Sequence, residues 1–217
     1  MFTVAIVYHS GNGHTAKQAR AVAEGVQGFD GARALLIPVE KVDEHWGDLE
    51  KAEAIIFGAP TYMGSASAEF KKFMDASSKI WYAQGWKDKI AAGFTNSASQ
   101  SGDKLNTLVQ FVIFAGQHSM TWINAGMLPG NNNSKGGIED LNRLGGFIGA
   151  MAQSNFDEPA DVAPPATDLR TAAKFGARVA EATKRWTDGT ANHAGKDANN
   201  GSQGQTTRHE QVARITA

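Results

Sequence analysis

The sequence predicts an α/β fold in which one parallel sheet of five strands is covered by helices on both faces. Short apolar runs rich in Val, Ile and Ala alternate with segments whose apolar residues recur at helical spacing. Polar loops follow the first, third and fourth of these runs. The chain has 217 residues, of which 41% are hydrophobic, so it can form one domain with a substantial core.

The first half of the chain begins with a strand at residues 4–8, whose apolar side chains suit a strand buried on both faces. A helix is expected from about residue 14 to 26, because Ala19, Val22 and Val26 recur at helical spacing and Gly28 can end it. The patterns that follow predict strands at 34–39 and 52–58 and a helix at 66–77, for which Ser65 or Ser67 is a suitable cap.

The second half continues with a strand at 89–94, a helix of about 15 residues from Asp103 and a strand at 121–127 that Pro129 ends. The stretch 141–152 is apolar but rich in glycine, and its pattern does not decide between helix and irregular chain. A last helix is expected from 168 to about 186. We therefore predict one domain over 1–187 and a disordered polar tail over 188–217, which has few apolar residues.

The order of the strands follows from the three polar loops. Ligands of such sheets bind beyond the carboxyl ends of the strands, where the strand order reverses. The three loops can converge there only if the first, third and fourth strands are neighbours. The order 2-1-3-4-5 makes them neighbours, in a doubly wound fold of three layers.

Composition excludes several classes of function. The 21 basic and 22 acidic residues give a net charge of −1, so neither nucleic acid nor an anionic membrane is an expected partner. The chain has no cysteine, which excludes disulfides, thiolate nucleophiles and zinc–thiolate sites. No metal-ligand spacing is shown by His9, His45, His193 or His209, and we expect no metal. No secretory signal or membrane-spanning run is evident, which fits a cytoplasmic location.

The turn from Ser10 to Thr15 is the strongest candidate for a binding site. It joins a buried strand directly to a helix, whose first N–H groups and positive dipole end favour an anion, most often a phosphate. The turn also matches the dinucleotide pattern G-x-G-x-x-A, with Glu40 as the acidic partner. Its hydroxyl groups and the polar loops downstream favour a phosphate monoester instead. A P-loop lysine is absent, and a merely connecting turn is the remaining alternative.

The opening segment resembles the N-terminal signature of flavodoxin-like proteins, through Ile6-Val7-Tyr8-x-Ser10-x-x-Gly13-x-Thr15-x-x-x-Ala19-x-x-Val22. Later segments are similar to the NAD(P)H:quinone oxidoreductase branch, which comprises the WrbA-like flavoproteins, and to NADPH-dependent FMN reductases. These are Gly58-Ala59-Pro60-Thr61-Tyr62-Met63-Gly64, Phe70-Lys71-Lys72-Phe73-Met74-Asp75 with Trp81, His118, Asn142-Arg143-Leu144-Gly145-Gly146 and Ala152-Gln153-Ser154. The resemblance implies bound FMN, with its phosphate in the first turn.

The resemblance also implies a role for each polar loop. The phosphate would lie against Ser10, Gly11, Asn12, Gly13, His14 and Thr15. The edge of the flavin ring would lie along Pro60, Thr61, Tyr62 and Met63. The carbonyl side of the ring would face Thr95, Asn96, Ser97, Ala98, Ser99 and Gln100, near the start of the following helix. That helix start favours negative charge on the reduced flavin.

Each role has a structural alternative. Ser10 and Thr15 can cap the helix, and His14 can be solvated. Tyr62 and Met63 can cover the core. Trp81 and His118 are expected to contact the substrate, with His118 as the candidate catalytic residue. Trp81 can equally be a core or subunit-interface residue, and a lone histidine is often structural.

The function expected from the resemblance is an FMN-dependent oxidoreductase that takes hydride from NAD(P)H and passes two electrons to a quinone or similar acceptor. One alternative is an electron carrier of the flavodoxin type, against which the small net charge argues. Another is a descendant without flavin. The helix after Asp103 is apolar around most of its circumference, so we expect a homodimer or homotetramer.

Overall fold

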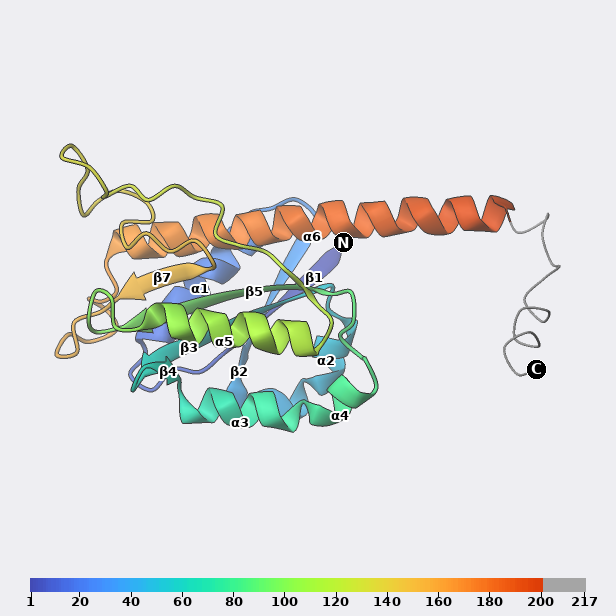
Figure 1. The fold of residues 1–217 in the computed structure, drawn as a ribbon, viewed down its shortest axis with the longest axis horizontal. Helices are drawn as coiled ribbons and strands as arrows, with labels where there is room; N and C mark the ends of the chain where they lie inside the picture. The colour runs from blue at the N-terminus through green and yellow to red at the C-terminus, as the bar shows by residue number, and fades with distance from the viewer. Residues whose placement is uncertain (201–217) are drawn as a thin grey trace, which may run out of the picture. The chain divides into compact units, whose positions relative to one another are not determined.

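The computed structural model describes the backbone of residues 1–200 and the side chains of residues 1–189 (Figure 1). The strands are β1 (Phe2–Tyr8), β2 (Ala32–Pro38), β3 (Ala54–Tyr62), β4 (Ser65–Ala66), β5 (Ile90–Ser97), β6 (Thr121–Trp122) and β7 (Ala150–Gln153). The helices are α1 (His14–Gln27), the 3₁₀ helix η1 (Val39–Glu44), α2 (Trp46–Lys51), α3 (Ala68–Ala76), α4 (Ser78–Tyr82), α5 (Lys104–Gln117) and α6 (Ala166–Asn200).

The sheet confirms the predicted doubly wound topology. Its order is β2-β1-β3-β5-β6, and every neighbouring pair on this path is parallel. The short strand β4 is an antiparallel extension of β3, so β5 and β6 are the predicted fourth and fifth strands. The carboxyl ends of β1, β3 and β5 are therefore adjacent, as the polar loops require.

The fifth position of the sheet is shared by two short strands. β6 pairs with the beginning of β5, and β7 pairs with its end. The predicted strand over 121–127 was too long, and the undecided stretch 141–152 contains β7. Gly149 allows this second segment to approach, because a Cβ there would lie 2.2 Å from the carbonyl oxygen of Gly93. The segment after β7 is thereby brought to the carboxyl edge of the sheet.

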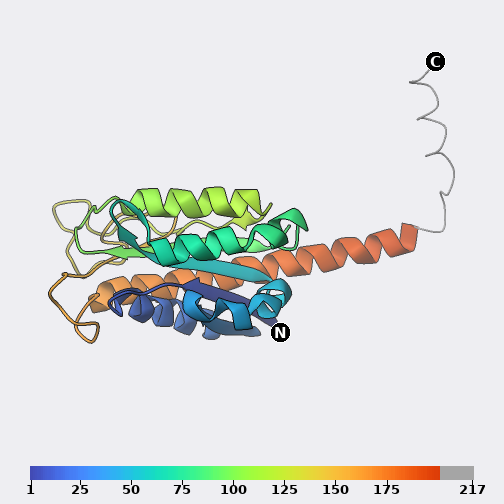
Figure 2. The same ribbon diagram turned by 90° about the horizontal axis from the view of Figure 1, so that it is seen from below.

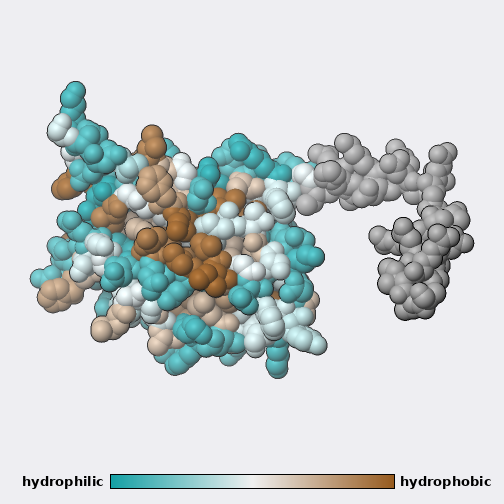
Figure 3. Space-filling model, viewed as in Figure 1, coloured by the Kyte–Doolittle hydropathy of each residue, from teal (hydrophilic) through white to brown (hydrophobic). Residues whose placement is uncertain are grey.

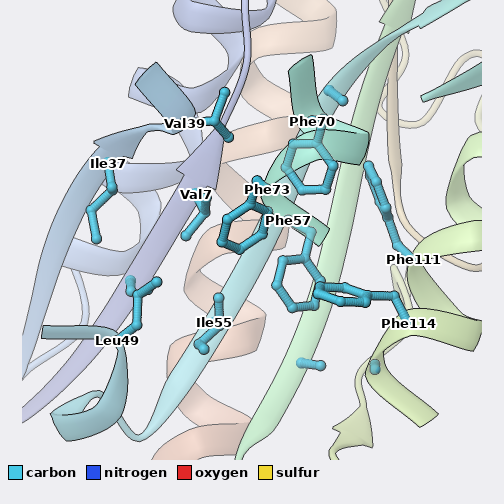
Figure 4. Packing of buried hydrophobic residues seen from close by; sticks show 14 of the residues in the cluster. Val7, Ile37, Val39, Leu49, Ile55, Phe57, Phe70, Phe73, Phe111 and Phe114 are labelled. Carbon is cyan, nitrogen blue, oxygen red and sulfur yellow. The ribbon is translucent and has the colours of Figure 1, made fainter. Parts of the chain in front are cut away.

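Helices cover both faces of the sheet, which gives the predicted three layers (Figure 2). On one face α1 and the first part of α6 pack on a cluster that includes Val4, Ile6, Val22, Phe94 and Phe175. On the other face α3 and α5 pack on an aromatic cluster (Figure 4), which includes Phe57, Phe70, Phe73, Phe111 and Phe114. Successive residues of β3 point alternately into these two clusters, as the strand periodicity requires.

The last helix differs from its predicted end. α6 continues past Trp186 to Asn200, and no proline follows Pro165 in the sequence. Residues 188–200 of the predicted disordered tail are thus helical, and residues 201–217 lie outside the described residues. The division at residue 187 stays a prediction. Among the described residues, no helix combines the length and apolarity needed to span a membrane.

Candidate functional site

A pocket of about 160 Å³ lies beyond the carboxyl ends of β1, β3 and β5. It brings together side chains from all three predicted loops and from the segment after β7. The lining residues are Asn12, His14, Thr15, Pro60, Thr61, Tyr62, Asn96, Ser97, Ala98, Ser154 and Phe156. The predicted convergence of the loops is therefore present in the structure.

The turn after β1 leaves several backbone donors free. α1 begins at His14, and its N-cap Gly13 has φ +84° and no side-chain capping bond. The N–H of Ala16 donates to Ser10 Oγ at 3.0 Å, and that of Lys17 to the Gly13 carbonyl at 3.0 Å. The N–H groups of residues 12–15 have no acceptor within the described residues. Together with the helix dipole, these donors suit a phosphate dianion.

The two hydroxyl groups of this turn have different surroundings. Ser10 Oγ already accepts the N–H of Ala16, which is the capping role considered for it from the sequence. Thr15 lines the pocket, and its hydroxyl makes no hydrogen bond to the described residues. Thr15 is therefore the hydroxyl that can reach an anion without breaking an existing bond.

The segment after β7 covers this turn. The His14 ring is buried, and its Nε2 donates to the carbonyl oxygen of Glu158 at 2.8 Å, so the solvated alternative for His14 is wrong. Lys17 Nζ donates to the carbonyl oxygen of Asp161 at 2.9 Å. A Cβ on Gly13 would lie 2.8 Å from that of Ala160. Sequence reasoning missed this segment, because its two hydrogen bonds to α1 each join residues 144 positions apart.

Thr61, which lines the pocket, is joined to two further buried threonines. Thr61 Oγ1 is 2.8 Å from the hydroxyl oxygens of both Thr95 and Thr107, and the Thr95 hydroxyl also donates to the Ala59 carbonyl. All three side chains are buried. This network joins β3, β5 and α5, so the hydroxyls of Thr61 and Thr95 support the loops rather than face a ligand.

Tyr62, the last residue of β3, and Met63, which follows it, have different surroundings. The Tyr62 hydroxyl lies over Gly11, where a Cβ would be 2.7 Å from it, and partial burial raises the pKa of Tyr62. Met63 has φ +48° and a fully solvent-exposed side chain that does not line the pocket. Neither residue covers the core, which was the alternative considered for both.

The end of β5 and the loop after it face two pockets. Asn96, Ser97 and Ala98 line the first, and the Ser154 hydroxyl donates to Asn96 Oδ1 at 3.2 Å. Gln100 instead lines a second pocket of about 490 Å³, beside Arg143 and Phe147. The predicted cofactor contacts of this loop are therefore concentrated at its beginning.

Lys104 is a site residue that sequence reasoning missed. Its side chain is 1% exposed, and Nζ donates to Ser97 Oγ at 2.6 Å and to the Ser99 carbonyl at 2.7 Å. Burial lowers the pKa of Lys104 to about 8. A lysine next to polar loop residues looks solvent-exposed in the sequence. A positive charge at a helix N-terminus is unfavourable, and this position was the one feature of the sequence that could have drawn attention to Lys104.

The structure places His118 far from the pocket and does not bring Trp81 to it. His118 caps the far end of α5, about 20 Å from Lys104 by helix rise. It is 1% exposed and packs against Trp86 and Phe114, so it cannot contact a ligand in the pocket. Trp81 lies on α4, and its partly exposed side chain lines none of the pockets described above.

Comparison with known proteins gives matches over most of the chain. Residues 33–133 match the family described as NADPH-dependent FMN reductase. The chain is 42% identical over 184 residues to flavodoxin FldP of Pseudomonas aeruginosa, covering 83% of this chain and 96% of that protein. It is 28% identical over 208 residues to an NAD(P)H dehydrogenase (quinone) of Archaeoglobus fulgidus, covering 85% and 99% respectively.

A solved structure agrees with the sequence matches. The crystal structure of the flavodoxin, WrbA-like protein from Agrobacterium tumefaciens superposes with a TM-score of 0.66 at 41% identity. The match covers 85% of this chain and 99% of that one. An archaeal flavodoxin structure, at 20% identity and a TM-score of 0.57, shares the fold.

Proposed function

The chain belongs to the flavodoxin-like WrbA/FMN reductase family, and from this premise we propose that it binds FMN and acts as an NAD(P)H-dependent oxidoreductase. The electrons would pass to a quinone or a similar small acceptor. FMN supplies the two-electron redox chemistry when bound. The protein contributes binding, orientation and electrostatics.

The observation that carries this proposal is the turn after β1. Backbone N–H groups of residues 12–15, at the positive end of α1, have no acceptor within the described residues, and the Thr15 hydroxyl lies beside them. The neighbouring pocket is bordered by the loops after β3 and β5. A terminal phosphate in the turn and a planar ring between the two loops fit this arrangement.

The proposed contacts with FMN come from three segments of the chain. We propose that Asn12, His14 and Thr15 bind the phosphate, and that Pro60, Thr61 and Tyr62 border the ring through backbone and aromatic surface. Asn96, Ser97 and Ala98 would offer polar groups to the other edge of the ring. Met63 is fully exposed, so it can contact only a ligand outside the pocket.

An electron-carrier function is the second candidate, because the 42% identical relative from Pseudomonas aeruginosa is named a flavodoxin. A carrier passes electrons between proteins and has no small-molecule substrate of its own. The net charge of −1 gives little electrostatic attraction for a basic partner, which favours the enzyme.

Steady-state turnover separates the two candidates. The purified chain, loaded with FMN, is mixed with NADPH or NADH and a soluble benzoquinone, and nucleotide oxidation is followed at saturating acceptor. An enzyme sustains many turnovers per flavin, whereas a carrier shows almost none. A Thr15→Val variant, which we expect to bind FMN less tightly, serves as the control for turnover by free FMN.

We also propose that the chain forms a homodimer or homotetramer. The outer face of α5 exposes Leu105 and Ile113, with Val109 and Val112 partly exposed beside them. Figure 3 shows hydrophobic surface gathered on the side where α5 lies. Light scattering at micromolar concentration gives the mass directly, and a monomer would contradict the proposal.

A further inference from the structure

Lys104 stands directly behind the wall of the pocket. Its Nζ donates to Ser97 Oγ, and Ser97 itself lines the pocket. The same Nζ donates to the carbonyl oxygen of Ser99, two residues further along the loop. One buried side chain therefore fixes the shape of the loop that would face the FMN ring.

The charge of Lys104 is not neutralised by its hydrogen-bond partners, since both acceptors are uncharged. Asp168 of α6 is the acidic group that acts on it, but both oxygens of Asp168 accept from Arg143 at 2.8 Å. These side chains are all at most 9% exposed. Two cations and one anion leave this buried group with a net charge of +1.

A buried net positive charge lowers the stability of the folded chain when no ligand is bound. A buried ammonium group loses its hydration, and Lys104 also lies in the first turn of α5, where the helix dipole already favours negative charge. With its pKa of about 8, the side chain is still mainly protonated at pH 7. Negative charge in the adjacent pocket would offset this cost.

We propose that Lys104 is a positioning residue, which holds residues 97–99 against the FMN ring and makes bound FMN easier to reduce by placing an uncompensated positive charge behind that wall. This inference rests on the proposed function, because it needs FMN in the pocket. It adds a residue that binds no ligand directly and acts through Ser97 and Ser99.

The test compares Lys104→Met with Lys89→Met. Lys89 is a matched control, since its Nζ also donates to two carbonyl groups, those of Glu50 and Ala52, and burial also lowers its pKa. It precedes β5, at the other end of the sheet. The midpoint potential of bound FMN is measured for both variants and wild type. Amide hydrogen exchange of residues 97–102 is measured on the FMN-free proteins.

We expect Lys104→Met to lose at least tenfold in its preference for reduced over oxidised FMN, which corresponds to a potential lower by about 30 mV. Exchange across 97–102 should become faster. Lys104→Arg, which keeps the charge, should restore most of the potential. Lys89→Met should leave both quantities unchanged. If Lys104→Met does not fold, Lys104→Gln removes the charge and retains N–H donors.

Two results would overturn the inference in different ways. If wild type binds FMN and the uncharged variants share its potential, Lys104 is only a structural residue and the proposed function stands. If wild type binds no FMN, the inference and the proposed function fail together.

Discussion

The two ends of the sheet differ in whether their polar groups are accessible to a ligand. At the carboxyl ends of the strands, backbone N–H groups of residues 12–15 face a pocket and have no acceptor within the described residues. At the other end, His118 Nε2 shares one hydrogen bond with Ser77 Oγ, at 2.9 Å. The rest of the His118 ring lies among aromatic rings. Polar groups are thus available to a ligand at the carboxyl ends of the strands, whereas at the opposite end they are part of the packed interior.

This difference shows that residue type alone does not identify a site. His118 and Trp86 each have a buried nitrogen without a partner in the described chain, yet no pocket described above reaches them. The glycines and hydroxyls of the first turn have less distinctive side chains. They form the better candidate site because the helix N-terminus supplies hydrogen-bond donors.

The largest expected effect is that of Gly13→Val. Its φ of +84° and the closeness of Ala160 force the turn out of shape, so FMN affinity should fall about 100-fold or more as several charge-assisted hydrogen bonds are lost. Gly31→Val is the matched control, since Gly31 has φ +78° and no atom within 4 Å of an added Cβ. Gly31→Val should lose about 1–2 kcal/mol of stability from its backbone conformation, and Gly13→Val should lose more because of the contact with Ala160. Fluorescence titration showing equal FMN affinity for the two would contradict the phosphate assignment.

The second effect is a pH dependence that originates from His118. Burial lowers its pKa to about 4 in the folded protein, whereas an unfolded histidine titrates near 6.5. Between these values the unfolded chain binds more protons, so stability is lost as the pH falls, by about 3 kcal/mol in total. His118→Gln should flatten this dependence in urea unfolding from pH 7 to 4. A marked loss of FMN affinity in the same variant would instead show that His118 contributes to FMN binding.

The third and smallest effect separates Thr15 from Ser10. Thr15→Val should weaken FMN binding about 10-fold to 100-fold, because a hydroxyl bond to a charged group contributes about 1.5–3 kcal/mol. Ser10→Ala removes the acceptor of the Ala16 N–H and should cost about 1 kcal/mol of stability, with a smaller change in affinity. Calorimetric titration and thermal unfolding of both variants measure the two quantities. The reverse ranking would mean that Ser10 releases Ala16 to bind the phosphate.

Sequence pattern predicted the fold and the local structure of the first turn. The alternation of apolar strands with amphipathic helices predicted a parallel sheet, and the three polar loops predicted its strand order. Gly11-Asn12-Gly13 directly before a helix predicted an anion site, which stays a prediction. These features depend on neighbours in the sequence. The segment around Glu158 could not be found in this way, because its contacts are made only in the folded chain. Lys104 offered one local signal, its position at a helix N-terminus, but its bonds to Ser97 and Ser99 are likewise made only in the folded chain.

Trp81 and His118, which lie outside the pocket, were placed by resemblance alone. The expected helix from Asp103 already put His118 at its far end, away from the carboxyl ends of the strands. Position in the sequence did not show which surface Trp81 would face. The strand β7 was undecided because glycines interrupt its pattern, and these same glycines allow it to reach β5.

Titration of the purified chain with FMN, followed by absorption and by quenching of flavin fluorescence, tests the central claim most directly. We expect one FMN per chain, with the bound flavin bleached on addition of NADPH and recoloured by a quinone. A chain that stays colourless and leaves the fluorescence of added FMN unquenched would contradict the flavin site at the turn after β1.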